Sequence, residues 1–350
     1  MRKFTGFQHG VNLGGWLSQC VATTGEHFDS YITDADIKWI HGMGLDHVRL
    51  PVDYNWIEAE DGAPIEAGLR HIDDCVGWCE EMDLNLLLTP RSKSFRAPQS
   101  KSFGATQSKS FRTPQSKSFR ATQERFIALW RRLTKRYGQR KNVAFDLLNE
   151  VVSPDVVEEW NGIVERTICA IREYAPEAWI VVGGVCCNNV RSVPLLDPPH
   201  DARIAYNFHC YEPMIFTHQK ACWVENMPAD LEVAWPDDLE HYKALSKQLS
   251  FDLAGAIAGQ RVQFLGPRFF EALFAPALEA AERYDVPLYC GEYGVIDRAP
   301  TADTLRWLKD ISTVFTRHGI GRALWNYKEK DFGLIDAHYD AIRDLMIGLL

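Results

Sequence analysis

A chain of 350 residues with 46% hydrophobic side chains is long enough for two domains or one large barrel with a full core. Its formal net charge of −9 argues against general nucleic-acid binding, and no apolar run approaches the roughly 18 residues of a membrane helix. The first residues contain no long apolar run, so we expect no secretory signal. Nine cysteines without a C-x-x-C pair indicate reduced thiols and a cytoplasmic location, although secretion by another route stays open.

Short apolar runs typical of buried strands alternate with segments whose apolar residues recur at helical spacing. The expected strands are residues 7–16, 46–51, 84–88, 143–148, 179–183, 204–208, 287–290 and 323–325. The expected helices are residues 33–43, 65–82, 124–137, 155–174, 301–316 and 340–350. Eight strands alternating with helices predict an α/β fold, a (β/α)8 barrel that spans residues 1–350 as a single catalytic domain.

Two segments interrupt the alternation. Residues 91–122 are four copies of an eight-residue unit, RSKSFRAP, QSKSFGAT, QSKSFRTP and QSKSFRAT, with eight basic and no acidic side chains. Such Ser-rich basic sequence cannot bury enough apolar surface to fold alone, so we expect a long loop after the third strand. Residues 212–265, after the sixth strand, are too long for a plain connection, and we expect an inserted lid subdomain there.

Catalytic groups of such a barrel lie at the C-terminal ends of its strands. The side chains expected there are Arg49, Asn149, Glu150, His209, Tyr211, Glu292 and Trp325. Two glutamates, on the fourth and seventh strands, can act as nucleophile and acid/base in glycoside hydrolysis. A nearby cation and phenol keep one carboxylate ionised, burial and the first negative charge keep the other protonated, and an indole offers a flat face to a sugar.

Each of these residues alone also has an ordinary explanation. A glutamate can serve as a helix-terminal charge or an ion-pair partner, an arginine as a salt bridge, and a histidine or tryptophan as a core side chain. Their coincidence at strand ends favours catalysis. The chain has no zinc-type spacing, no H-E-x-x-H, no P-loop and no G-x-G-x-x-G after a strand, so we expect no metal and no cofactor.

Several segments together resemble glycoside hydrolase family 5, of the retaining clan, and in particular its clostridial endoglucanase C type. They are GVNLGGWLSQ, HFDSYITDADI, DHVRLPVDY, AFDLLNEVV, YNFHCYEPMIFTHQKACW, LYCGEYGVI and ALWNYKEKDFGLID. The resemblance implies that Glu150 is the acid/base and Glu292 the nucleophile. It also implies substrate-binding roles for the other five residues, a β-1,4-glucan or mixed-linkage β-glucan as substrate, and no metal.

The segment after the third strand departs from the family, which carries a histidine there that lines the sugar site. This chain has Thr89-Pro90-Arg91-Ser92 and then the eight-residue units. We expect a monomeric retaining β-glucanase that binds β-glucan or cello-oligosaccharide, with no nucleic-acid or membrane partner. The alternatives are a catalytically impaired β-glucan-binding barrel, an exo-acting β-1,3-glucanase or β-mannanase, and a barrel enzyme of another reaction type. Linkage preference and endo or exo action are left open.

Overall fold

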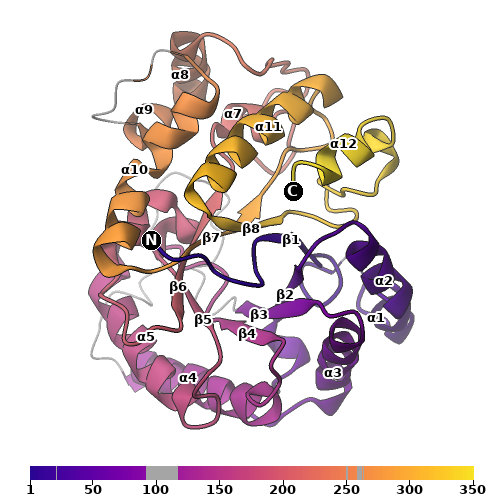
Figure 1. The fold of residues 1–350 in the computed structure, drawn as a ribbon, viewed down its shortest axis with the longest axis vertical. Coiled ribbons are helices and arrows are strands. Elements are labelled where there is room, and N and C mark those ends of the chain that lie inside the picture. Colours follow the sequence, from indigo (N-terminus) through magenta and orange to yellow (C-terminus); the bar gives the residue numbers. More distant parts are fainter. Residues whose placement is uncertain (21, 92–116, 250, 258–261, 263) are drawn as a thin grey trace.

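A computed structural model describes residues 1–20, 22–91, 117–249, 251–257, 262 and 264–350 of the chain. Eight parallel strands close into a barrel in the order β1 to β8, with helices around it (Figure 1). The strands are β1 (His9–Asn12), β2 (His47–Asp53), β3 (Asn85–Arg91), β4 (Val143–Asp146), β5 (Ile180–Gly183), β6 (Ile204–Cys210), β7 (Leu288–Tyr293) and β8 (Gly321–Leu324). The expected (β/α)8 barrel is confirmed, and each expected strand is present.

Helices follow or precede these strands around the barrel. They are α1 (Gly25–Ser30), α2 (Asp34–Gly42), α3 (Glu66–Glu81), α4 (Lys117–Tyr137), α5 (Val157–Arg172), α6 (Val185–Asn188), α7 (Met214–Thr217), α8 (Leu239–Gln248), α9 (Leu253–Ala256), α10 (Pro267–Tyr284), α11 (Thr301–His318) and α12 (Arg343–Ile347). Within the described residues, no helix combines the length and apolar character needed to cross a bilayer. All nine cysteines are free, as expected.

Three segments differ from the secondary structure expected from the sequence. Helix α10 was not among the expected helices; it contains Pro276, and its aromatic face is buried. Helix α4 begins at Lys117, so the end of the expected 91–122 loop is helical, while residues 92–116 lie outside the described residues. The expected helix at 340–350 is shorter in the structure, where only α12 is helical. Arg343 donates to the carbonyls of Leu334 and Ile335 and holds the preceding chain in turns.

The expected insertion at 212–265 contains the short helices α7, α8 and α9 in its described part, and α8 and α9 lie outside the ring of barrel helices in Figure 1. Trp235 anchors the segment. Its buried ring lies 5.9 Å from that of Phe216 and 5.8 Å from that of Phe270, and its indole N–H donates to Asp310 on α11 at 2.9 Å. The segment is therefore packed on α10 and α11, and its role as a lid stays a prediction.

The inside of the barrel changes from apolar to polar along the strands. A buried cluster fills the N-terminal end, and it comprises Phe4, Phe7, Leu87, Ala144, Val181, Ala205, Tyr289 and Ala323. Two residues further along their strands lie Thr89, Asp146 and Asn207, which share hydrogen bonds. Because strand side chains alternate in direction, a step of two residues keeps the same inward face.

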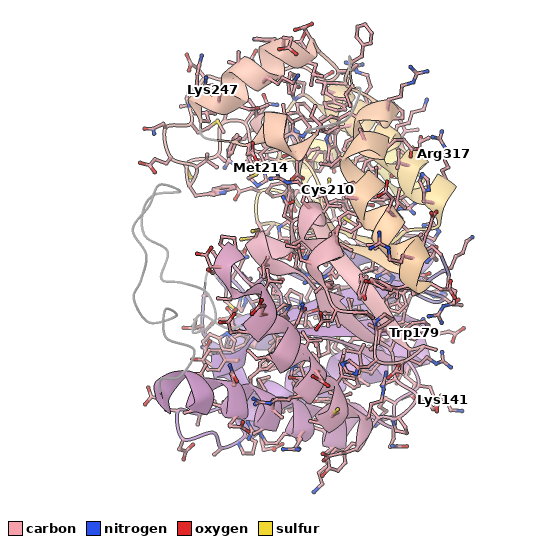
Figure 2. The ribbon with its side chains drawn as sticks, turned by 90° about the vertical axis from the view of Figure 1, so that its left-hand side faces the viewer. Lys141, Trp179, Cys210, Met214, Lys247 and Arg317 are labelled. Atoms are coloured by element: carbon pink, nitrogen blue, oxygen red, sulfur yellow. The ribbon has the colours of Figure 1, made fainter. Side chains whose placement is uncertain are left out.

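The polar level lies towards the end of the barrel at which the strands finish. Figure 2 shows Trp179 and Lys141, which precede β5 and β4, on one side of the molecule. Met214, which follows β6, lies towards the other side. The C-terminal ends of the strands therefore carry the buried polar groups, where barrel enzymes place their chemistry.

Candidate active site

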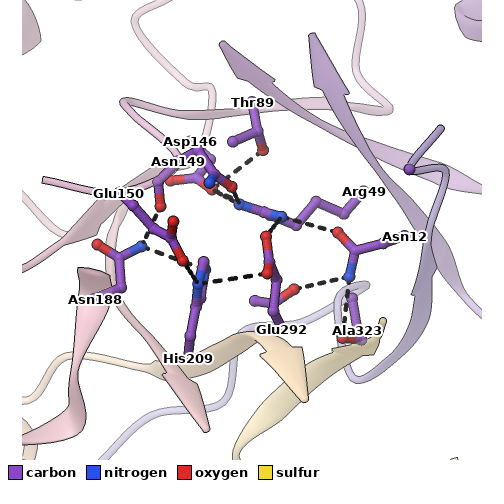
Figure 3. A network of polar contacts seen from close by, with 12 residues as sticks. Asn12, Arg49, Thr89, Asp146, Asn149, Glu150, Asn188, His209, Glu292 and Ala323 are labelled. Atoms are coloured by element: carbon purple, nitrogen blue, oxygen red, sulfur yellow. Dashed lines mark hydrogen bonds and ion pairs between the residues drawn. The ribbon is translucent and has the colours of Figure 1, made fainter. Parts of the chain in front are cut away.

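Arg49 on β2 is the centre of a buried polar network at this end of the barrel (Figure 3). Its Nη1 donates to Asn12 Oδ1 at 2.8 Å and to Glu292 Oε1 at 2.9 Å. Its Nε and Nη2 donate to Asp146 Oδ2 at 3.2 and 3.1 Å, and Nη2 also donates to Asn149 Oδ1 at 2.8 Å. Burial alone acts to lower the pKa of Arg49, but the two neighbouring carboxylates outweigh it and raise that pKa, so the guanidinium stays charged.

Asp146 on β4 is the buried partner that holds Arg49 in place. Its Oδ2 also accepts from the Thr89 hydroxyl at 3.1 Å and from Asn207 Nδ2 at 3.5 Å. Burial raises the pKa of the Asp146 carboxyl, and the charge of Arg49 opposes that rise. The sequence prediction missed Asp146, although an acid inside the apolar run Val-Ala-Phe-Asp-Leu-Leu is a signal, since a buried carboxylate needs partners. It also missed Asn12 of this network.

Glu292 lies in β7, one residue before the strand ends, and its side chain is only 9% exposed. Its Oε1 accepts from Arg49, and its Oε2 accepts from the Tyr211 hydroxyl at 3.1 Å. Burial, and then the charges of Glu292 and Glu150, raise the pKa of Tyr211 well above its ordinary value. The phenol therefore remains a protonated donor to Glu292, which holds both carboxylate oxygens in fixed positions.

Glu150 follows β4 and faces Glu292 across a narrow gap. Its Oε1 lies 3.1 Å from His209 Nδ1, and the same ring nitrogen lies 3.7 Å from Glu292 Oε2. One oxygen of each glutamate and one His209 nitrogen all lie within 4.8 Å of one another. This is near the roughly 5–5.5 Å separation of retaining glycosidases and well below the roughly 6.5–9.5 Å of inverting ones.

Six of the seven residues selected from the sequence share this hydrogen-bonded network, and Trp325 joins it by packing. Trp325 directly follows β8, is 6% exposed, and donates its backbone N–H to the carbonyl of Tyr293, next to Glu292. The neighbouring Asn326 side chain accepts from the Gly14 N–H at 2.9 Å and donates to the Gly14 carbonyl at 3.0 Å. A side chain at Gly14 would meet the Trp325 ring at 2.5 Å, so this glycine makes room for the indole.

The group formed by Glu150, His209 and Glu292 also contains ligand types that divalent cations use. Among the described residues it is the one group of three such side chains whose ligand atoms converge. Arg49 and Tyr211 already donate to Glu292, and the positive guanidinium opposes a second cation beside it.

The end of β3, where the sequence departs from the family, contributes two hydrogen-bond partners to the network. The Thr89 hydroxyl binds Asp146, and the Pro90 carbonyl accepts the backbone N–H of Asn149 at 3.1 Å. The segment that follows Arg91 lies outside the described residues. The effect of the absent family histidine on activity therefore stays a prediction.

Comparison with known proteins places this geometry in context. Residues 8–331 match the family model described as Cellulase (glycosyl hydrolase family 5). The chain is 39% identical over 327 residues to Cellodextrinase A of Ruminococcus flavefaciens, with 92% of this chain and 86% of that protein covered. It is 36% identical over 357 residues to Endoglucanase C of Acetivibrio thermocellus, with 98% of each covered. A solved structure described as an endoglucanase superposes with a TM-score of 0.75 at 20% identity, covering 98% of this chain and 97% of that one.

Proposed function

This chain belongs to glycoside hydrolase family 5, the cellulase family, and on that premise we propose that it cleaves β-glucan chains internally by double displacement. Glu292 is the nucleophile and Glu150 the acid/base. The observation that carries this assignment is the approach of one oxygen of each carboxylate to within 4.8 Å of the other at the C-terminal end of the barrel. Such a gap suits direct attack on a sugar and leaves little room for the water that inversion requires.

In the first step, a carboxylate oxygen of Glu292 attacks the anomeric carbon while Glu150 gives its proton to the leaving glycosidic oxygen. The bond from the anomeric carbon to that oxygen breaks, and a glycosyl ester forms on Glu292. In the second step, Glu150 removes a proton from water, whose oxygen attacks the same carbon. The ester bond to Glu292 breaks, which frees the carboxylate and releases the sugar. Two inversions at one carbon give a product with the original β configuration.

The surrounding side chains prepare these steps. Arg49 pairs with the carboxylate of Glu292, and the Tyr211 hydroxyl fixes its second oxygen, so the nucleophile is oriented before the sugar arrives. The Oδ1 of Asn149 accepts from Arg49, which directs the amide nitrogen away from the guanidinium and towards a sugar hydroxyl. The indole of Trp325 supplies an apolar face for the ring that is cleaved.

The substrate class follows from the relatives at 36% and 39% identity, which are an endoglucanase and a cellodextrinase. We infer that this chain acts on β-1,4-linked or mixed-linkage glucan and on cello-oligosaccharides, as a monomer. The residues of the network come from this one chain, so the site is built without a second subunit.

The stereochemistry of the first product tests the mechanism. Proton NMR during cello-oligosaccharide hydrolysis should show the β-anomer first, with the α-anomer appearing later by mutarotation. Glu292→Gln should abolish turnover of an aryl β-cellobioside. Glu158→Gln, a matched change at an exposed position on α5, should leave turnover unchanged. An α-anomer first, or full activity in Glu292→Gln, would refute the assignment.

A further inference from the structure

A short left-handed turn follows β5, next to the two glutamates. Cys186, Cys187 and Asn188 have φ values of 54°, 58° and 56°. L-residues other than glycine rarely adopt this conformation, and three in succession persist only where the surrounding contacts hold them. One such contact is the backbone N–H of Cys187, which donates to the carbonyl of Val151 at 2.9 Å. The turn is therefore tied to the residue that follows Glu150.

The turn directs the side chain of Asn188 into the barrel, where it is fully buried. Asn188 Nδ2 donates to the backbone carbonyl of Asn149 at 2.7 Å and lies 3.3 Å from His209 Nε2 (Figure 3). Its side chain occupies space that Gly183 leaves open, since a Cβ on that glycine would collide with the amide. The left-handed backbone and the missing side chain at Gly183 thus place the buried amide of Asn188 against the imidazole of His209.

This contact determines which nitrogen of His209 carries the proton. The Asn149 carbonyl fixes the orientation of the Asn188 amide, because it requires a donor. Nδ2 has only protons to offer, so Nε2 of the imidazole accepts and the ring proton resides on Nδ1. Nδ1–H then donates to Glu150 Oε1 at 3.1 Å. The unprotonated oxygen of a carboxylic acid is the better acceptor, so Oε1 takes that role and the acidic proton resides on Oε2.

We propose that Asn188 is a positioning residue that fixes the tautomer of His209 and thereby assigns the acid proton of Glu150 to its second oxygen. The kinetic consequence of this inference rests on the proposed function. The tautomer of His209 does not depend on activity. Other charged or titratable groups also face the His209–Glu150 pair. They are Arg49 from β2, Asp146 from β4, Glu292 from β7 and Tyr211 after β6.

Nitrogen-15 NMR of histidine-labelled protein tests the tautomer directly, with the His209 signals assigned by their loss in His209→Gln. The wild type should show a protonated Nδ1 and an unprotonated Nε2. Asn188→Asp keeps the size and tolerates the left-handed backbone, but its carboxylate accepts rather than donates, so Nε2 should gain a proton. A wild-type ring protonated on Nε2, or unchanged signals in Asn188→Asp, would overturn the proposal.

Kinetics with an aryl β-cellobioside measure the consequence for Glu150. In Asn188→Gly, where glycine suits the left-handed turn, kcat should fall roughly tenfold or more with KM little changed, by analogy with the loss of an outer partner of a metal-binding histidine. The basic limb of the kcat/KM profile should move to higher pH, because ionised Glu150 loses a fixed donor. An Asn188→Gly profile that superposes on the wild type would contradict the positioning role.

Cys186→Gly is the matched control, since it relaxes the same turn at an exposed side chain. It should keep the wild-type profile, and a shift equal to that of Asn188→Gly would assign the effect to the turn rather than to the amide. The two proposals fail separately. A correct tautomer without retaining hydrolysis would defeat the proposed function alone, and retention with the opposite tautomer would defeat this inference alone.

Discussion

Arg49→Met removes a buried guanidinium whose five N–H groups all bind protein acceptors. The change leaves Asp146 and Glu292 without their cation, and breaking a buried pair in this way costs about 3–5 kcal/mol of unfolding free energy. A chain of this length unfolds with an entropy of about 0.7 kcal/mol/K, so the melting temperature should fall by about 4–7 °C. Turnover should also be lost, because Glu292, the proposed nucleophile, is no longer held.

The pH dependence identifies the cause. Burial raises the pKa of Asp146 and Arg49 opposes that rise, so the pKa in the variant is higher still. The folded variant then binds a proton that the unfolded chain lacks, and its stability increases as pH falls from 7 towards 4. The deficit measured by thermal unfolding should therefore shrink at pH 5.

Two further variants complete this test. Adding Asp146→Asn to Arg49→Met should recover part of the loss at pH 7, because one unpaired buried charge is removed. Arg70→Met, which breaks an exposed pair with Asp29, should change the unfolding free energy by less than about 1 kcal/mol. If Arg49→Met costs no more than Arg70→Met, or if its deficit grows at pH 5, the reasoning about this network is wrong.

Three other changes probe the site and its surroundings. Gly14→Ala places a methyl group 2.5 Å from the Trp325 ring and should lower kcat/KM on cello-oligosaccharides, whereas Gly25→Ala, which meets open space, should keep it. Tyr211→Phe removes a donor to the proposed nucleophile and should lower kcat on aryl β-cellobioside by roughly 10²-fold. Burial lowers the pKa of His218 to about 4, so only the unfolded chain takes up this proton between pH 6.5 and 4. The wild type should lose about 2 kcal/mol of stability from this group between pH 7 and 5, and thermal unfolding of His218→Phe should not show that loss.

The barrel was predictable because each strand is a short apolar run between amphipathic helices, and eight such strand–helix units typically close into a (β/α)8 barrel. Helix α10 was not, because Pro276 interrupts its pattern, although a helix tolerates this proline once Phe270 and Phe274 are buried against their neighbours. The start of α4 inside the last eight-residue unit was missed for the opposite reason. Its Ser-rich composition indicates a loop, and the continuing helix overrides that preference.

The location of the seven candidate residues at one end of the barrel was predictable because parallel strands end at one face, so sequence positions far apart meet there. The deeper level was harder to find. Asp146 lies two residues beyond the apolar Ala144, and its place inside an apolar run was a signal that the prediction did not use. Asn12 lies two residues beyond Gly10, so no apolar side chain on its strand marks the inward face there. Asn188 depends on a left-handed turn. Asparagine tolerates that conformation, but the two cysteines before it do not favour it, so the sequence did not indicate the turn.

The hydrogen bonds of Arg49 bear on the substrate-binding role that was predicted for it. Arg49 was expected to bind substrate, but each of its N–H groups already has a protein acceptor, so in the proposed mechanism it would act through Glu292 and Asn149. The shared guanidinium holds Glu292, the proposed nucleophile, and Asn149 relative to each other before substrate binds, which would reduce the reorganisation needed in the transition state of the proposed reaction. Lysine at position 49 would keep the charge but has only three donors, so it cannot hold both carboxylates and both amides together. With both effects expressed as free energies, Arg49→Lys should therefore raise the activation barrier for kcat far more than it lowers the unfolding free energy. Equal losses in both would show that charge alone, rather than shared geometry, is what the site requires.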